Sequence, residues 1–511
     1  MEAKKRVARL YSGELEGVDA RIVEIEADVS VGLRTFNIVG LADRALNEAK
    51  ERVNSALKNS GVKPPSRENR KVTINLAPAD MRKTGSHYDL AIALGYLLAS
   101  GQIREFETRD IIFLGELALD GRLRPVSGIL NIAERAVREG FTRIVVPKEN
   151  ANEAAAIRAI GALPAETLSD VVAILEGKKD PISYTYSDQR NRPQNDRVDF
   201  AEISGQENAK RALMIAAAAR HNMLLIGPPG VGKSILAQAM AGILPELSEE
   251  ESIEITKIWS AAGLSDGGLL REPPFRAPHQ TASTIALIGG GGEPRPGEIS
   301  LAHKGVLFLD ELPEFPRASL EALRQPLETG EVHIARAKHS IAFPARFTLV
   351  AAMNPCPCGY YGSATKECTC SAYEVVKYQK RISGPLLDRM DLQIKIGAIH
   401  LGPWGNEKEN EPMSSRSARE KIWMAKQAQH TRFKGSAKTN ADMTPKEIKE
   451  FAQLTNDARS FLGEITQHHL SPRAYYRIIK TARTIADLEG ESAISKIHIA
   501  EAFGYRVKDL W

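Results

Sequence analysis

Two patterns of apolar and polar residues alternate over the first 176 residues of the chain. Residues 21–26 and 71–76 place apolar side chains at every second position, which is the period of a half-buried strand. Residues 46–57 repeat apolar side chains at helical spacing, and residues 89–100 are apolar enough for a buried helix. Together these patterns predict a mixed α+β domain over residues 1–176.

The rest of the chain divides at two polar stretches. Residues 177–199 are rich in polar residues and proline without an apolar period, and we expect a linker there. Strand and helix patterns then alternate over residues 200–400, which predicts an α/β domain. A second polar stretch precedes a helical tail over residues 417–511. In that tail, Ser471 and Pro472 form an N-cap followed by proline at the first helical position.

Composition changes this picture little. The chain has 511 residues, of which 43% are apolar and 26% charged, as expected for a globular protein of several domains. Its 68 basic and 64 acidic residues nearly balance, so binding of nucleic acid would have to come from local patches. No signal peptide is visible, and no apolar run approaches the ~18–20 residues of a membrane span. We therefore expect a cytoplasmic protein that does not bind membranes.

The first segment that predicts nucleotide binding is a glycine-rich loop. It lies between a predicted strand, residues 223–226, and a predicted helix, residues 235–244. Glycines let backbone N–H groups surround a phosphate, and the dipole of the following helix favours its negative charge. The pattern predicts that ATP and Mg²⁺ are bound by these residues: Gly227, Pro228, Pro229, Gly230, Val231, Gly232, Lys233 and Ser234. Lys233 is expected to reach the β- and γ-phosphates, and the Ser234 hydroxyl to ligate magnesium.

Acidic and amide side chains follow two further apolar runs. Residues 306–309 lead directly into Asp310 and Glu311, and residues 347–352 are soon followed by Asn354. In a P-loop protein, Asp310 would hold the magnesium shell and Glu311 would polarise the attacking water. Asn354 would orient that water beside the γ-phosphate.

A cation is usually needed to stabilise the charge of the transition state. Arg389, at the end of a Gly-Pro-Leu-Leu-Asp-Arg motif, and Arg473, near the start of a tail helix, are the candidates. The alternative is that both are surface arginines, and for Arg389 the motif context favours a catalytic role.

All the cysteines of the chain lie in one short stretch. A disulfide framework would spread them along the sequence, whereas four clustered thiolates suit a tetrahedral zinc ion. A site without an open ligand position would be structural, and reduced thiols or redox chemistry are the alternatives. The candidate zinc ligands form two Cys-x-Cys pairs separated by nine residues: Cys356, Cys358, Cys368 and Cys370.

The order of the P-loop, Leu-Asp-Glu-Leu, an asparagine after a strand, and Leu-Leu-Asp-Arg is similar to that of AAA+ ATPases. Three further motifs, at residues 275–279, 295–300 and 381–385, narrow the resemblance to the bacterial magnesium-chelatase-like family. The resemblance covers essentially the whole chain. Gln280 departs from the pattern, which would place a second histidine there.

This resemblance implies a P-loop AAA+ module with a C-terminal helical lid, assembled as a homohexamer with ATP between subunits. Asn354 would be the first sensor, Arg389 the finger that reaches a neighbour's nucleotide, and Arg473 the second sensor. Ile203 and the pair Gly205-Gln206 would border the adenine. The implied activity is that of an ATP-driven DNA helicase that promotes branch migration in recombination, as in natural transformation.

The N-terminal domain resembles the proteolytic domain of Lon-type proteases, for example through residues 121–128. Such a protease needs a serine nucleophile and a lysine base. The aligned positions hold His87 and Leu130, although Ser86 and Lys83 lie nearby in the sequence. We therefore expect an inactive scaffold rather than a protease.

Residues 332–341 predict two strands around a basic turn. In the AAA+ rings that the chain resembles, such a hairpin faces the pore, where Arg336, Lys338 and His339 would track the phosphates of single-stranded or branched DNA. From the residues alone, a solvated turn is the simpler interpretation. Three rival functions are a chelatase-like ATPase that remodels a protein partner, an ATP-dependent protease and a nucleotide-switched scaffold.

Overall fold

The chain folds into two compact units, one of Met1–Arg192 with Ser252–Leu270 and one of Pro193–Glu251 with Arg271–Trp511. Each unit has its own hydrophobic core. The computed structural model describes these residues: 7–41, 44–67, 69–188, 198–292, 294–335, 340–363, 366–397, 413–466 and 471–506. In the described part of the chain, no helix combines the length and the apolarity needed to cross a bilayer.

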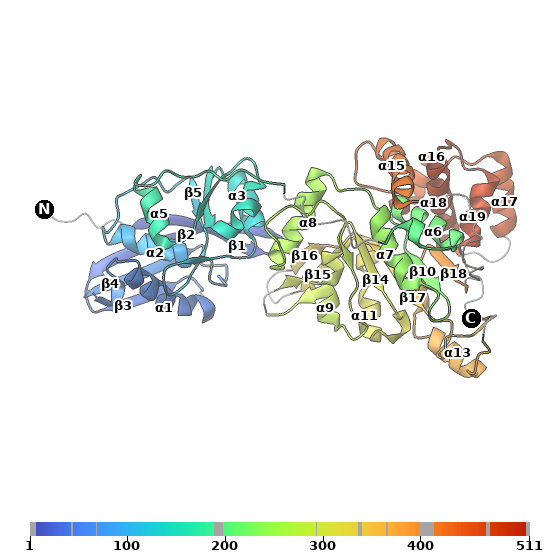
Figure 1. Cartoon of the computed structure of the whole chain (residues 1–511), viewed down its shortest axis with the longest axis horizontal. Coiled ribbons are helices and arrows are strands. Elements are labelled where there is room, and N and C mark those ends of the chain that lie inside the picture. Colours follow the sequence, from blue (N-terminus) through green and yellow to red (C-terminus); the bar gives the residue numbers. More distant parts are fainter. Residues whose placement is uncertain are drawn as a thin grey trace. The chain divides into compact units, whose positions relative to one another are not determined.

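The first unit contains a seven-stranded sheet in the order β3-β4-β2-β1-β5-β8-β9. Strands β1 to β5 are labelled in Figure 1. Its central pair β1–β2 is antiparallel, and the strands from β5 to β9 continue the sheet in parallel with β1. The strands of this sheet are β1 (Ala8–Glu16), β2 (Asp19–Val31), β3 (Thr35–Val39), β4 (Arg70–Ala77), β5 (Ile111–Phe113), β8 (Arg143–Pro147) and β9 (Gly161–Ala165). A separate hairpin joins β6 (Glu116–Leu117) to β7 (Leu123–Arg124).

Helices cover this sheet and close its core. The apolar spacing that predicted two helices is confirmed, because the apolar faces of α1 and α2 are buried with β2 and β4 in one cluster. The helical segments of the unit, apart from α8, are α1 (Arg44–Asn59), η1 (Pro65–Arg67), α2 (Asp89–Ala99), α3 (Ile129–Arg138), η2 (Lys148–Asn150), α4 (Ala151–Ala155) and α5 (Leu168–Leu175). Tyr184, from the stretch expected to be a linker, bonds through its N–H to the carbonyl of Ala162 at 2.9 Å, so it packs with this unit.

Residues 252–270 belong to the first unit, although they lie within the sequence expected to form the second domain. They contain most of α8 (Glu249–Ala261). Lys257 forms an ion pair with Glu134 at 2.6 Å, and the Ser260 hydroxyl donates to the buried carboxyl group of Glu153. These polar contacts fix the segment on helices α3 and α4.

The second unit is built on a five-stranded parallel sheet in the order β11-β14-β17-β10-β18. The apolar runs that predicted its central strands are confirmed, since every residue of β10, β14 and β17 is buried. The strands are β10 (Met223–Ile226), β11 (Phe275–Arg276), β14 (Val306–Leu309), β17 (Thr348–Met353) and β18 (Leu392–Lys395). Two hairpins accompany the sheet: β12 (Gly289–Gly290) with β13 (Arg295–Pro296), and β15 (Glu331–Ala335) with β16 (Ser340–Pro344).

Helical segments connect the strands of this sheet, and a group of C-terminal helices follows it. The connecting segments are η4 (Phe200–Glu202), α6 (Glu207–Ala219), α7 (Lys233–Ile243), α9 (Thr284–Ile288), α10 (Glu298–Leu301), η5 (Leu312–Glu314), α11 (Arg317–Ala322), α12 (Pro326–Thr329), α13 (Ala372–Gln379) and α14 (Gly384–Leu387). The C-terminal helices gather in one group (Figure 1): α15 (Ser415–Arg432), η6 (Asn440–Asp442), α16 (Pro445–Phe451), α17 (Asn456–Thr466), α18 (Pro472–Leu488) and α19 (Lys496–Gly504).

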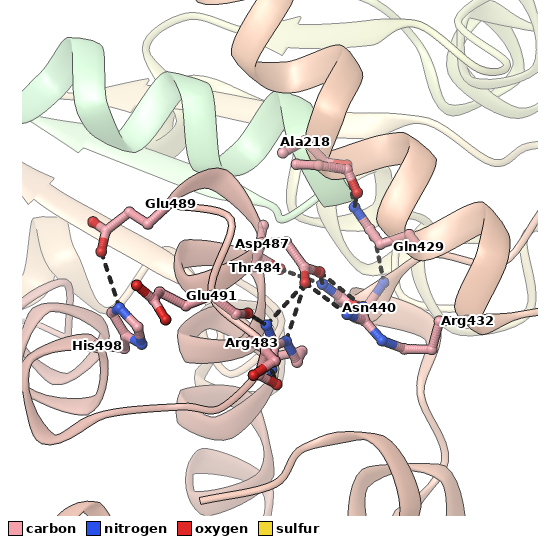
Figure 2. Close-up of polar contacts among 12 residues, drawn as sticks. Ala218, Gln429, Arg432, Asn440, Arg483, Thr484, Asp487, Glu489, Glu491 and His498 are labelled. Carbon is pink, nitrogen blue, oxygen red and sulfur yellow. Dashed lines mark hydrogen bonds and ion pairs between the residues drawn. The ribbon is translucent and has the colours of Figure 1, made fainter. Parts of the chain in front are cut away.

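A buried polar network holds the C-terminal helices together around Asp487 (Figure 2). Its carboxylate accepts from Arg432 at 2.6 and 2.8 Å, from Asn440 at 2.7 Å and from Arg483 at 3.2 Å. Nearby, the Gln429 side chain donates to the carbonyl of Ala218 at 3.0 Å, at the end of α6. Because these groups are shielded from water, each depends on its partners for hydrogen bonding.

Candidate nucleotide site

The predicted nucleotide-binding residues meet at one edge of the parallel sheet of the second unit. The strand β17 lies between β10 and β14, so the carboxyl ends of three neighbouring strands face the same region. Ile226 at the end of β10 pairs with Met353 at the end of β17. In open α/β sheets, ligands bind outside the carboxyl ends of the strands. The fold therefore places the glycine-rich loop, the acidic pair and Asn354 at the edge where a nucleotide is expected.

The glycine-rich loop leads directly into α7. Gly232 caps this helix with a φ of +88°, a conformation that favours glycine. The first helical residue, Lys233, turns its ammonium group into the loop, where it donates to the carbonyls of Gly227 at 2.8 Å and Pro228 at 2.9 Å. A third bond reaches the side-chain oxygen of Asn354 at 3.0 Å. The cation thus lies against the glycine-rich loop, where a phosphate group can replace these acceptors.

Burial lowers the pKa of Lys233, and the nearby carboxylates of Asp310 and Glu311 act in the opposite direction. The Ser234 hydroxyl donates a hydrogen bond to Asp310 at 2.8 Å. This bond brings two oxygen atoms that can ligate a metal ion together beside the loop. Hard oxygen donors of this kind suit Mg²⁺. Glu311 is exposed and has a φ of +50°, and its backbone N–H bonds to Asp310 at 2.9 Å.

The two candidate arginines converge on one carboxylate. Arg389 is buried and donates to Glu328, and its guanidinium also bonds to the carbonyl of Pro385 at 2.6 Å. Arg473, near the start of α18, is exposed and lies 3.6 Å from the same Glu328. Burial lowers the pKa of Arg389, whereas the carboxylate of Glu328 raises it. The structure therefore brings Arg389 and Arg473 together, and Arg389 is not a surface arginine.

The residues expected near the adenine lie beside the last strand of the sheet. Ile203 is buried, and Gln206 begins α6 in a left-handed conformation. The Gln206 side chain donates to the carbonyl of Gly397 at 2.9 Å, just beyond β18. This contact brings the start of α6 to the same edge as the glycine-rich loop.

The four cysteines form a cluster in the loop between β17 and α13. All four Sγ atoms lie within 4.8 Å of one another, and none forms a disulfide. One thiol, Cys356, is buried, and the others are partly exposed. The donor set and its compactness fit a soft tetrahedral metal such as zinc.

In the first unit, Ser86 and Lys83 would be the serine and the lysine of a shifted protease dyad. Their side chains donate to different acceptors instead of to each other. The Ser86 hydroxyl donates to Glu116, and the buried amine of Lys83 donates to the carbonyl of Pro78. The position aligned with a protease lysine holds Leu130, which is buried in a cluster with Leu269. This arrangement offers no lysine base to activate Ser86.

The candidate DNA contacts can be placed only in part. The two strands predicted around the basic turn are confirmed as β15 and β16, which pair from Glu331 and Pro344 to Ala335 and Ser340. Residues 336–339, which include Arg336, Lys338 and His339, lie outside the described residues.

Comparison with known proteins identifies the family of this chain. Residues 199–402 match the family model "Magnesium chelatase, subunit ChlI", and models of the same subunit match residues 25–150 and, for its C-terminal part, 412–506. Competence protein ComM of Haemophilus influenzae is 44% identical over 508 residues, which cover 98% of this chain and 97% of ComM. The chain belongs to the magnesium-chelatase-like AAA+ family.

Other members of this family differ in how much of the chain they resemble. The YifB protein of Escherichia coli is 43% identical over 503 residues, which cover 96% of both chains. The magnesium-chelatase 38 kDa subunit of Rhodobacter capsulatus is 29% identical over 175 residues, 30% of this chain and 50% of the subunit. The likeness to ComM therefore includes both units, whereas the likeness to this chelatase subunit covers only part of the chain.

Sequence reasoning missed three features of this family member. Glu328, the shared partner of the two arginines, lies in a polar segment without a recognisable motif. The contact of Gly359 with Pro229 joins two loops that only the fold brings together. The docking of residues 252–270 on the first unit had no recognisable signal in the sequence.

Proposed function

We propose that this protein is an ATP-driven DNA motor that works as a homohexamer and promotes branch migration during recombination, as in natural transformation. The observation that carries the proposal is the convergence of Lys233, Ser234, Asp310 and Asn354 at one sheet edge. The near full-length likeness to a competence protein supports DNA as the substrate on which the ATPase acts.

Each residue of the site has a role in this proposal. The loop N–H groups and Lys233 bind the phosphates of ATP, and Glu311 polarises the attacking water and accepts its proton. Asn354 orients that water. Arg389 acts as the finger that stabilises the transition-state charge of a neighbouring subunit, and Arg473 senses the nucleotide from α18.

We also propose that the protein binds two kinds of metal ion. Ser234 and Asp310 would hold Mg²⁺, which neutralises phosphate charge when it is bound. The thiolates of the cysteine cluster would hold a structural Zn²⁺, because four protein ligands leave no open position for chemistry. Arg336, Lys338 and His339 are the proposed contacts to single-stranded or branched DNA.

A second candidate function is an ATPase that remodels a protein partner, as the magnesium-chelatase name of the family model suggests. In that case the same site would hydrolyse ATP, but DNA would not change the rate. The two functions therefore share the nucleotide site and differ in what stimulates it.

The experiment that separates them measures ATP hydrolysis without DNA, with single-stranded DNA and with a four-way junction. We expect DNA to raise the rate several-fold, and Glu311→Gln to abolish hydrolysis while it retains ATP binding. A triple variant with Arg336, Lys338 and His339 changed to alanine should keep its basal rate and lose the stimulation. Hydrolysis that no DNA changes would contradict the motor and favour the remodelling ATPase.

A further inference from the structure

The four-cysteine loop has the geometry of a closed metal site. Cys358 Sγ lies 3.3 Å from the Sγ atom of Cys356 and 3.5 Å from that of Cys368. These separations are far longer than the ~2.05 Å of a disulfide and close to the ~3.8 Å between ligands of a tetrahedral zinc with 2.3 Å Zn–S bonds. Backbone N–H groups of Cys358 and Tyr361 also point at cluster sulfurs, at 3.4 and 3.3 Å. Such donors stabilise thiolates around a metal.

The same loop lies directly against the glycine-rich loop. Gly359 follows the first cysteine pair and has a φ of +88°. A Cβ atom at this position would lie 2.6 Å from Cδ of Pro229 and 3.8 Å from Cγ of Asn354. The backbone at Gly359 therefore lies close to both the phosphate loop and the proposed first sensor. A displacement of Gly359 would be felt by both.

A second connection runs from the other cysteine pair through α13. Ser371 caps this helix immediately after Cys370, with a capping box that includes Glu374. At the far end of α13, the buried Gln379 donates to the carbonyl of Pro355, one residue before the first cysteine, at 2.9 Å. The cluster thus closes a ring of chain that begins and ends beside Asn354.

We propose that metal bound by the four cysteines braces the nucleotide site of its own subunit, so that metal occupancy sets the affinity for ATP. The proposal rests on the proposed nucleotide site and adds its regulation. Without the metal, four free thiols hold the loop only by weak contacts, and Gly359 is released from Pro229. With the metal, the loop is fixed at four points and the glycine-rich loop is held in its binding shape. The preorganised loop then loses less entropy when ATP binds.

The first experiment compares metal content with ATP affinity in the full-length protein. Zinc is measured by mass spectrometry, and affinity is measured by equilibrium titration of a fluorescent ATP analogue with Mg²⁺. Relative to wild type, Cys368→Ser with Cys370→Ser should lose zinc and bind the analogue about tenfold more weakly, a difference of ~1.4 kcal/mol. Circular dichroism checks that the variant remains folded.

The second experiment breaks the contact and leaves every thiol in place. Gly359→Ala puts a methyl group against Pro229, and Gly362→Ala is its matched control. Gly362 lies in the same loop with a φ of +71°, and nothing lies within 4 Å of a Cβ there. Both variants should retain zinc, but only Gly359→Ala should weaken binding of the analogue.

The possible outcomes are distinct. If the cysteine variant loses zinc and keeps wild-type affinity, or if Gly359→Ala binds ATP as well as Gly362→Ala, the brace does not exist. If wild-type protein with full zinc fails to bind the analogue, the proposed nucleotide site is wrong, and the proposal that the metal braces it is wrong as well. Weakening in both the cysteine variant and Gly359→Ala, with the control unaffected, supports the proposal.

Discussion

Arg389 and Glu328 form an ion pair within a single chain, and only 6% of the Arg389 side chain is exposed. A finger that serves the ATP of a neighbouring subunit must leave such a partner when the neighbour's nucleotide arrives. Arg473 lies near the same carboxylate, at 3.6 Å. Glu328 thus contacts both residues proposed to act as catalytic cations.

The finger role proposed for Arg389 predicts that this residue acts on the neighbouring subunit. Arg389→Ala lacks the proposed finger and Lys233→Ala lacks the proposed phosphate contact, so each variant alone should lose ATP turnover by roughly 10³-fold or more. When the two are mixed, an Arg389→Ala subunit can receive the finger of its Lys233→Ala neighbour. Turnover should therefore recover in part, as measured by phosphate release at a range of mixing ratios.

One control and one further variant accompany the mixing experiment. Arg138→Ala removes an exposed arginine that also pairs with a glutamate, Glu134, and should leave turnover unchanged. Glu328→Gln weakens the hold on Arg389 and should raise the basal rate a few-fold. Absence of recovery in mixed rings, with assembly intact, would show that Arg389 does not act in trans.

Lys233 and Asn354 contact each other, but substitutions at the two positions should have different effects on ATP binding and hydrolysis. The ammonium of Lys233 attracts the phosphates in the ground state, so Lys233→Ala should weaken binding of a fluorescent ATP analogue by at least about tenfold. Asn354 is proposed to orient the attacking water, so Asn354→Ala should keep binding within a few-fold and lower kcat by roughly 10²-fold. Titration and steady-state hydrolysis measure the two effects separately. Equal loss of affinity in both variants would contradict the assignment.

The carboxylate of Asp487 should be essential for the C-terminal helices. Its loss in Asp487→Ala would leave the buried Arg483 and the partly buried Arg432 without their carboxylate partner, at a cost of about 3–5 kcal/mol. Hydrogen exchange at the backbone amides of α18 measures this local stability independently of the first unit.

A matched control for this substitution lies on α15. Glu420 is paired with Arg416 four residues away, as Asp487 is with Arg483, but both members of the α15 pair are exposed. Glu420→Ala should cost at most about 0.5 kcal/mol. Similar exchange in both variants would mean that the buried network of Figure 2 does not stabilise the helices.

Local signals in the sequence predicted the strands and the loop of the nucleotide site, because each depends on neighbouring residues. The buried strand β10, the glycine-rich loop and the acidic pair after β14 are continuous segments whose apolar runs and glycines carry the information. Glu328 and Arg389 are 61 residues apart, and their contact follows from packing that no short pattern encodes. The same holds for the approach of Gly359 to Pro229.

The placement of residues 252–270 also escaped prediction for a physical reason. Its helix α8 has an unremarkable alternation of polar and apolar residues, so the sequence does not show which unit it packs against. Polar contacts that hold the segment in place involve two single carboxylates of the first unit, Glu153 and Glu134.

Glu153 predicts a pH dependence for this docked segment. Its carboxyl group is buried, and burial raises its pKa above the ordinary value of 4.5, while the bond from Ser260 acts in the opposite direction. Because the folded state binds the proton more tightly than the unfolded chain, the contribution to stability is fully present below the unfolded pKa. It is lost as the pH rises through the folded pKa. Wild-type protein should therefore unfold this segment at lower urea concentration at pH 8 than at pH 5.

Trp259, beside Ser260, reports this transition when Trp404, Trp423 and Trp511 are replaced by phenylalanine. In that background, Glu153→Gln should flatten the difference between pH 5 and pH 8, because an amide keeps an acceptor for Ser260 and does not ionise. The exposed neighbour Glu149 provides the control, and Glu149→Gln should keep the wild-type pH dependence. An unchanged pH dependence in Glu153→Gln would show that this carboxyl group does not control the docking of residues 252–270.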